Sequence, residues 1–150
     1  MKLMSPAFKN GQSINSKFTC DGEDASPELV WEGVPKETKS FVLIVDDPDA
    51  PKKTWVHWLV YNIPATVRRL EENVRVSSMP SAQEGISDSG KPQFYGPCPP
   101  KGEHRYFFKL FALDSMLTFP SRPTVDQLMK AMKGHILEKA ELMGTYKRTK

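Results

Sequence analysis

Two apolar runs lie close together in the first half of the chain. The first, SFVLIVDD, covers residues 40–47, and the second, WVHWLVYNIP, covers residues 55–64. A strand that is apolar at nearly every position is usually covered on both of its faces. The first run therefore predicts a central β-strand, which Pro48 and Pro51 end because proline cannot donate to a strand ladder. The second run predicts the strand that follows.

Two further segments have strand patterns. In LVWEGVP, residues 29–35, Leu29 and Trp31 share one face. In HRYFFKLFALD, residues 104–114, Lys109 is the one charged position among Phe107, Lys109, Phe111 and Leu113, which predicts a mostly buried strand.

The intervening residues 65–103 are mostly typical of turns, with a short strand predicted near residues 73–76 and a last strand in TYKR at 145–148. Loops of such length in a small domain are usually functional or disordered. The residues expected to be buried between two packed sheets are Phe41, Leu43, Val45, Trp58, Val60, Phe108 and Leu110.

Helical patterns occur only near the C-terminus. Thr124 and Gln127 have capping-box spacing after Pro123, which fixes the entry to a helix. The apolar positions that then recur at helical spacing are Val125, Leu128, Met129 and Met132, and Gly134 is expected to end or kink this helix. A second helix is predicted in HILEKAELM, residues 135–143, with Gly144 as its C-terminal cap.

Composition and charge exclude several classes of protein. The net charge of +3, from 21 basic and 18 acidic residues, is too small and too dispersed to predict nucleic-acid binding. No apolar run approaches the ~20 residues that span a bilayer, and the start, MKLMSPAFKNGQ, lacks the apolar core of a signal peptide. We therefore expect a cytoplasmic protein with a single domain over residues 1–150, and reduced thiols at Cys20 and Cys98.

Polar residues that could bind a ligand or take part in catalysis lie where strands meet Pro-rich turns. They are Asp47 and Asp49 in DPDAP, His57 in WVHW, and His104 and Tyr106 in HRY. Strand alternation would place His57 on one face with Leu59, and His104 on one face with Tyr106. Taken singly, each has an ordinary structural explanation: Asp-Pro turns are common, and a histidine can be a hydrogen-bonded core residue or lie on an edge strand.

Taken together, these stretches resemble the phosphatidylethanolamine-binding protein family, and within it the small bacterial and archaeal Raf-kinase-inhibitor-like branch. The matching pieces are SPELVWEGVP, SFVLIVDDPDAP, WVHWLVYNIP, GPCPPKGEHRYFFKLFALD and AELMGTYKR, which follow the family's order. The resemblance implies an antiparallel β-sandwich with short peripheral helices near the C-terminus, and a small pocket for phosphate-type anions. The ligand-binding residues that it implies are Asp47, Asp49, His57, Gly96, Cys98, Pro99, Pro100, His104 and Tyr106. Eukaryotic members have glycine in place of Cys98 and a longer loop before HRY.

The chemistry of these residue types is consistent with such a pocket. Imidazolium, tyrosine hydroxyl and free N–H groups are the donors that a buried anion needs. A nearby Asp47 or Asp49 would raise the pKa of His57 or His104 and favour the charged ring. We expect a tight turn with a cis Ala50–Pro51 peptide to aim both aspartates at the pocket.

The resemblance predicts a non-enzymatic binding protein without a cofactor, for a phospholipid headgroup or another phosphorylated small molecule. A protein partner such as a kinase or a protease, and a homodimer, stay open. Two alternatives from other classes also stay open. One is a hydrolase with Cys98 as nucleophile and His57 or His104 as base. The other is a metal site made of two histidines and a carboxylate.

Overall fold

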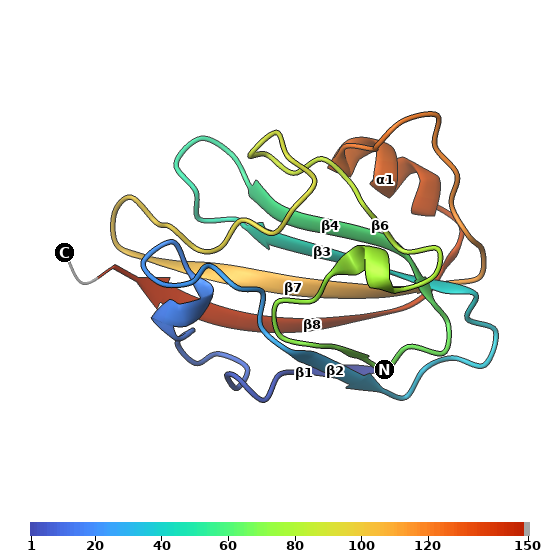
Figure 1. Cartoon of the computed structure of the whole chain (residues 1–150), viewed down its shortest axis with the longest axis horizontal. Coiled ribbons are helices and arrows are strands. Elements are labelled where there is room, and N and C mark those ends of the chain that lie inside the picture. The colour runs from blue at the N-terminus through green and yellow to red at the C-terminus, as the bar shows by residue number, and fades with distance from the viewer. Residues whose placement is uncertain (149–150) are drawn as a thin grey trace.

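The two apolar runs form neighbouring strands of the larger of two antiparallel sheets (Figure 1). The structure, a computed structural model, describes residues 1–148. The larger sheet has the strand order β6-β4-β3-β7-β8, and the smaller sheet has the order β1-β2-β5. The strands are β1 (Lys2–Met4), β2 (Leu29–Glu32), β3 (Ser40–Asp47), β4 (Trp55–Pro64), β5 (Arg69–Leu70), β6 (Gln83–Glu84), β7 (Glu103–Leu113) and β8 (Ile136–Lys147). The helical elements are η1 (Ser16–Phe18), η2 (Val76–Ser78) and α1 (Val125–Met132).

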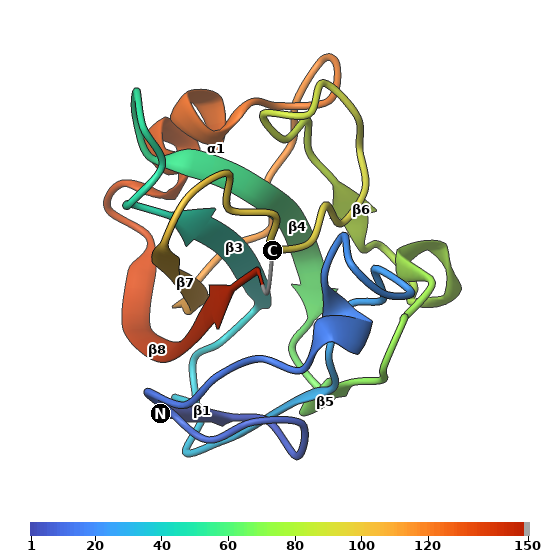
Figure 2. The same ribbon diagram turned by 90° about the vertical axis from the view of Figure 1, so that its left-hand side faces the viewer.

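The large sheet is covered on both faces, which explains why β3 is apolar from Phe41 to Val45. The small sheet and α1 lie on opposite sides of it (Figure 2). Phe41 and Leu43 of β3 pack with the residues between the sheets, whereas Val42 and Ile44 pack with Leu128 of α1. All seven residues that were expected between the sheets are buried there. The predicted sandwich architecture is therefore confirmed.

The predicted capping box begins α1. The Thr124 side chain accepts from the Gln127 backbone N–H, and the Gln127 side chain accepts from the Thr124 backbone N–H. The helix ends at Met132, and Gly134 follows with a φ of 84°, a conformation that glycine adopts without steric cost. Met129 is 46% exposed, so the interpretation of this residue as part of the core was wrong.

The predicted second helix at residues 135–143 is also wrong, because these residues belong to β8. Strand β8 pairs with β7 over nearly its whole length, for example Leu110 with Ala140 and Phe108 with Leu142. Burial alternates from Ala140 onward with the period of a strand. Pairing with a distant strand therefore overrides a weak local helical spacing. The strand predicted near residues 73–76 is likewise wrong. The short strand β5 ends earlier, at Leu70, and the 3-10 helix η2 begins at Val76.

Residues 10–14 cover part of the outer edge of β8. The Gly11 N–H donates to the Met143 carbonyl at 2.7 Å, and the Ile14 N–H donates to the Thr145 carbonyl at 2.7 Å. Gly144 lies between these two positions, and an added Cβ there would come within 2.6 Å of Ile14 and 2.7 Å of Phe8. Gly144 thus permits close packing within a strand and is not the helix cap that was predicted.

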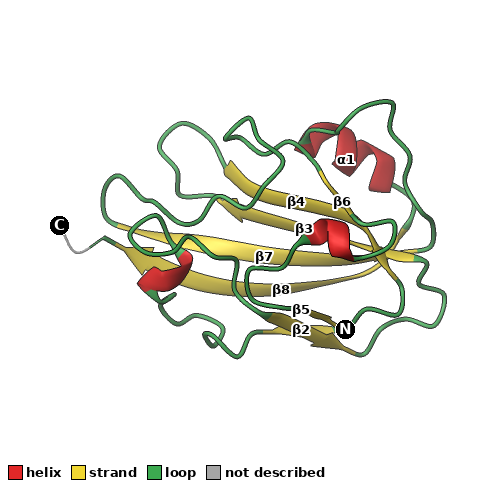
Figure 3. Ribbon diagram, in the orientation of Figure 1, coloured by secondary structure: helices red, strands yellow, loops and turns green. Residues whose placement is uncertain are grey.

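A long stretch without a helix or strand, residues 85–102, joins β6 to β7 (Figure 3). Across residues 1–148, no helix is both long and apolar enough to cross a membrane.

We predict that Leu128→Ala lowers the free energy of unfolding by about 2–5 kcal/mol, because it leaves a cavity where α1 packs on the large sheet. Met129→Ala is the matched control from the next position of the same helix, and it should change stability by less than about 0.5 kcal/mol. Urea denaturation of both variants measures the two effects. Equal losses would show that α1 does not cover the sheet through Leu128.

Candidate functional site

The loops after β3 and before β7 lie at the same end of the large sheet (Figure 1). A cavity of about 280 Å³ opens between them. Seven of the nine residues proposed from the sequence line it: Asp47, His57, Cys98, Pro99, Pro100, His104 and Tyr106. Asp49 and Gly96 are not among the lining residues. The remaining lining residues are Ala50 and Pro51 of DPDAP, Trp55 of WVHW, and Tyr95, and only Tyr95 lies outside the stretches quoted from the sequence.

A β-bulge in β4 turns His57 toward this cavity. Val45 pairs with Trp58 but the next residue, Asp46, pairs with Val56, so β4 has one extra residue at His57. The bulge reverses the alternation of faces, as bulges near functional sites often do. The His57 ring therefore lies 5.3 Å from that of Tyr106, whereas Leu59 faces α1. The prediction that His57 and Leu59 share a face is wrong for this reason.

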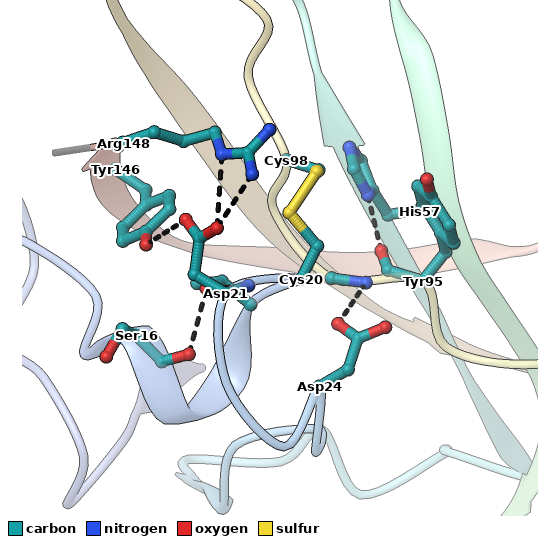
Figure 4. The surroundings of a disulfide bond; sticks show 11 residues. Ser16, Cys20, Asp21, Asp24, His57, Tyr95, Cys98, Tyr146 and Arg148 are labelled. Carbon is teal, nitrogen blue, oxygen red and sulfur yellow. Dashed lines mark hydrogen bonds and ion pairs between the residues drawn. A yellow bond between two sulfur atoms is a disulfide. The ribbon is translucent and has the colours of Figure 1, made fainter. Parts of the chain in front are cut away.

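Tyr95 fixes the orientation of the His57 ring (Figure 4). His57 Nδ1 contacts the Tyr95 carbonyl oxygen, and the Tyr95 N–H donates to the His57 carbonyl at 3.0 Å. Because a carbonyl oxygen only accepts, Nδ1 must carry the proton. Nε2 is then the ring nitrogen that is left for a ligand.

Burial decides the charge of His57. Removal from water disfavours the charged ring and lowers the pKa of His57 below its ordinary value of 6.5. The Tyr95 carbonyl and the carboxylates of Asp47 and Asp88 act in the opposite direction, with smaller effects. The expectation that a nearby aspartate raises the pKa of His57 is therefore wrong on balance, and the ring is mostly neutral at pH 7.

Asp47 holds the second histidine of the cavity. His104 Nδ1 lies 2.7 Å from Asp47 Oδ2, and His104 Nε2 lies 3.1 Å from the Lys101 carbonyl oxygen. Both partners are acceptors, so only the imidazolium form donates to both at once. In that form the charges of Asp47 and His104 cancel, and the buried carboxylate brings no net negative charge to the cavity.

The hydroxyl of Tyr106 is buried in the cavity wall and makes no hydrogen bond of ordinary geometry within residues 1–148, although the Asp47 carboxylate and the Cys98 backbone lie near it. The Tyr106 ring lies between those of His57 and His104. Burial, with a contribution from the Asp47 carboxylate, raises the pKa of Tyr106 above its ordinary value, so the hydroxyl keeps its proton and can donate it. A buried polar group without a partner costs about 1–3 kcal/mol, so a hydrogen bond from this hydroxyl to a polar group in the cavity would be stabilising.

Asp49 faces away from the cavity and fastens the turn to β7. It accepts from the Arg105 backbone N–H at 2.9 Å and from the Arg105 guanidinium at 2.8 and 2.9 Å. This guanidinium lowers the pKa of Asp49 to about 2. The prediction that the turn aims both aspartates at the cavity is therefore wrong.

The same turn contains no cis peptide bond, so the predicted cis Ala50–Pro51 bond is also wrong. The Asp49 N–H donates to Asp47 Oδ1 at 2.8 Å, and this contact closes the turn with the trans bonds that are preferred even before proline.

Gly96 acts by packing rather than by contact with a ligand. Its N–H donates to Asp24 Oδ1 at 3.0 Å, and a Cβ at this position would lie only 2.6 Å from the Phe18 carbonyl oxygen. The absence of a side chain therefore lets the loop before β7 lie directly against residues 18–24.

This close approach brings Cys20 and Cys98 into a disulfide bond (Figure 4). Their Cα atoms are 5.4 Å apart although the residues are 78 positions apart in the chain. The predicted reduced thiols are thus contradicted, because two loops that are distant in sequence are adjacent in space. A disulfide sulfur cannot act as the thiolate nucleophile of the hydrolase alternative. No group of three or more histidine, cysteine, aspartate or glutamate residues is placed to hold a metal in the described part of the chain, so the metal alternative has no support.

Comparisons with known proteins agree on one family. The family model for phosphatidylethanolamine-binding protein matches residues 4–147. A UPF0098 protein of Methanothermobacter thermautotrophicus is 48% identical over 150 residues, covering 99% of both chains. A UPF0098 protein of Chlamydia pneumoniae is 47% identical and covers 99% of this chain and all of its own.

Two crystal structures have the same fold. A putative phosphatidylethanolamine-binding protein homolog from Chlamydia trachomatis, CT736, superposes with a TM-score of 0.92 at 42% identity, covering 98% of this chain and 97% of its own. YbcL of E. coli, described as a new member of the mammalian PEBP family, superposes with a TM-score of 0.91 at 34% identity, covering 99% and 98%.

We predict that Asp49→Asn lowers the free energy of unfolding at pH 7 by about 1 kcal/mol, a value reduced from that of a buried charged hydrogen bond because the pair is partly exposed. The folded-state pKa is lowered, so the wild-type advantage is complete above the ordinary value of 3.8 and is lost as pH falls toward about 2. Denaturation across this pH range tests the trend.

The matched control is Glu141→Gln, which removes one partner of the exposed Lys139–Glu141 ion pair. It should change stability by less than about 0.5 kcal/mol. If Asp49→Asn is no more destabilising than this control at pH 7, the turn does not depend on Asp49.

Proposed function

Because the chain belongs to the phosphatidylethanolamine-binding protein family, we propose that it is a single-domain binding protein whose cavity receives a phosphate-type anion. The observation that supports this most directly is the buried hydroxyl of Tyr106, which lines the cavity without a partner in the described chain. A ligand oxygen would complete its hydrogen bonding.

Tyr106 and His57 would recognise different parts of a phosphate group. The Tyr106 hydroxyl keeps its proton and donates to an unprotonated oxygen. The neutral His57 ring presents Nε2 as an acceptor, which suits a phosphate that still carries one proton. A fully deprotonated anion such as sulfate would instead need the charged ring, so its binding should take up a proton at His57.

The size of the cavity supports a small group. Pockets for drug-sized ligands measure about 300–1,000 Å³, and this cavity lies just below that range at about 280 Å³. A phosphorylated small molecule or the headgroup of a phospholipid would present the same phosphate to it. The rim of the cavity consists of Trp55, Tyr95 and the prolines at positions 51, 99 and 100, which make it aromatic and rigid. A protein partner such as a kinase or a protease would contact this rim when the cavity holds its ligand.

We favour binding over catalysis because the cavity offers a donor, an acceptor and the paired Asp47 and His104 side chains but no free thiol nucleophile among the described residues. Cys98 is joined to Cys20, and Asp47 is occupied by His104 and by the Asp49 N–H. These contacts hold the site in shape and leave Tyr106 and His57 available to a ligand.

We predict that sulfate affinity rises as pH falls from about 8 to about 5 and levels off only below the ordinary histidine value near 6.5, because the His57 pKa lies below that value in the free protein. Tyr106→Phe should lower the affinity about tenfold, since a hydrogen bond to a charged group contributes about 1.5–3 kcal/mol. His57→Ala should flatten the pH dependence. Calorimetric titration with sulfate measures both effects.

The control is His135→Ala, because His135 pairs with Asp114 at an exposed site away from the cavity lining. It should change neither the affinity nor its pH dependence. A pH-independent affinity in the wild type, or a loss with His135→Ala as large as with Tyr106→Phe, would rule out the proposed anion site.

A further inference from the structure

The disulfide bond is part of the cavity wall rather than a distant crosslink. Cys98 lines the cavity together with Pro99 and Pro100, whereas Cys20 lies outside the lining, in the loop that follows η1. Both cysteines are partly exposed, so a thiol reagent can reach the bond. A change in this bond therefore acts on a wall of the site without altering the residues that would touch a ligand.

The wall segment, residues 98–102, has few ways to stay in place without the disulfide. Pro99 and Pro100 have no N–H to donate. The Pro97 carbonyl accepts from the Cys20 N–H at 3.1 Å just before the segment, and the Lys101 carbonyl faces the His104 ring near its end. The covalent bond at Cys98 is the tether between these two points.

The other end of the tether is firmly anchored. Asp21, next to Cys20, accepts from the Tyr146 hydroxyl at 2.6 Å and from the Arg148 guanidinium at 2.9 Å (Figure 4). Tyr146 belongs to β8, so the Cys20 loop is fixed to the large sheet. Loss of the disulfide would therefore free the wall segment while the Cys20 loop stayed where it is.

We propose that Cys20–Cys98 is a reversible redox site that sets the shape of the cavity, with a dithiol as its reductant. One thiolate of the dithiol attacks a sulfur of the disulfide and forms a mixed disulfide, and its second thiol then displaces the protein sulfur. Two electrons and two protons pass to the protein, which gains two cysteine thiols, and the dithiol becomes a disulfide. The effect on ligand affinity rests on the proposed anion site, whereas the effect on the wall does not.

The pKa of His57 depends on the position of the wall segment and can be measured without any ligand. Its ring bonds to Tyr95, which comes shortly before the wall segment, and its pKa is low because the ring is shielded from water. The groups that face the ring and favour its charge are the Tyr95 carbonyl, the carboxylates of Asp47 and Asp88, and the Gly96 backbone. A loosened wall admits water, so reduction should move the pKa of His57 upward, toward its ordinary value.

The test compares oxidised protein, protein reduced with dithiothreitol, and Cys20→Ser, which removes the bond and keeps Cys98 in the cavity. Nuclear magnetic resonance follows the titration of His57, and calorimetry measures sulfate affinity. Reduced wild type and Cys20→Ser should share a higher His57 pKa. Their sulfate affinity should be about tenfold weaker if the wall is in its binding position about a tenth of the time. Cys20→Ser should not respond to dithiothreitol, which is the matched control.

Hydrogen exchange separates a local effect from a loss of stability. In the reduced protein, hydrogen-bonded amides near the wall, such as those of Tyr95 and Gly96, should exchange faster while those of β3 do not change. If all amides accelerate together, or if His57 titrates identically in both redox states, the redox proposal is overturned. If no form binds sulfate but the His57 pKa still shifts on reduction, the proposed anion site fails and the redox proposal stands.

Discussion

The β-bulge in β4 is the constraint on which the cavity depends, because it uncouples the side chains at the strand end from those of the core. Within β4, Trp58 and Val60 pack between the sheets while Leu59 packs under α1. One extra residue turns His57 to the side of Tyr106 without disturbing that packing. The remaining features of the site then follow from neighbours: Asp47 on β3 reaches His104 on β7, and Tyr95 closes over His57 from the long loop.

The strands and helix whose patterns are local could be predicted from the sequence. The apolar runs of β3 and β4, the alternation in β7 and the capping box of Thr124 and Gln127 each depend on residues that are close in the chain. Strand β8 could not be recognised in this way. Ile136, Leu137 and Ala140 are compatible with a helix, and only the pairing with β7 selects a strand. Gly144 was misread for the same reason, since its packing partners Ile14 and Phe8 come from the other end of the chain.

The site was predictable to the extent that its residues belong to strand ends and to the Pro-rich loop. Tyr95 lies outside every quoted motif, and Trp55 was in the WVHW stretch without an assigned role, because stacking on His57 and a place in the cavity lining follow only from the fold. Asp49 was assigned to the cavity because it lies two residues from Asp47. In the structure its carboxylate is instead held by the backbone N–H and guanidinium of Arg105. The low pKa of His57 could not be inferred either, because sequence shows which charges exist but not how much water reaches them.

The segment at residues 10–14 has a consequence for how this protein associates with others. A free outer strand offers unpaired N–H and carbonyl groups to any second chain, and natural sheets avoid this exposure. Here the Gly11 and Ile14 N–H groups occupy the carbonyls of Met143 and Thr145, and the missing side chain of Gly144 lets the segment lie close to the strand. The chain thus caps part of its own sheet, and a second chain cannot add a strand at residues 143–145 of β8. Substitutions that detach this N-terminal segment would leave the cavity residues in place but expose the unpaired backbone groups of β8. The expected effect is aggregation through this strand edge rather than weaker ligand binding.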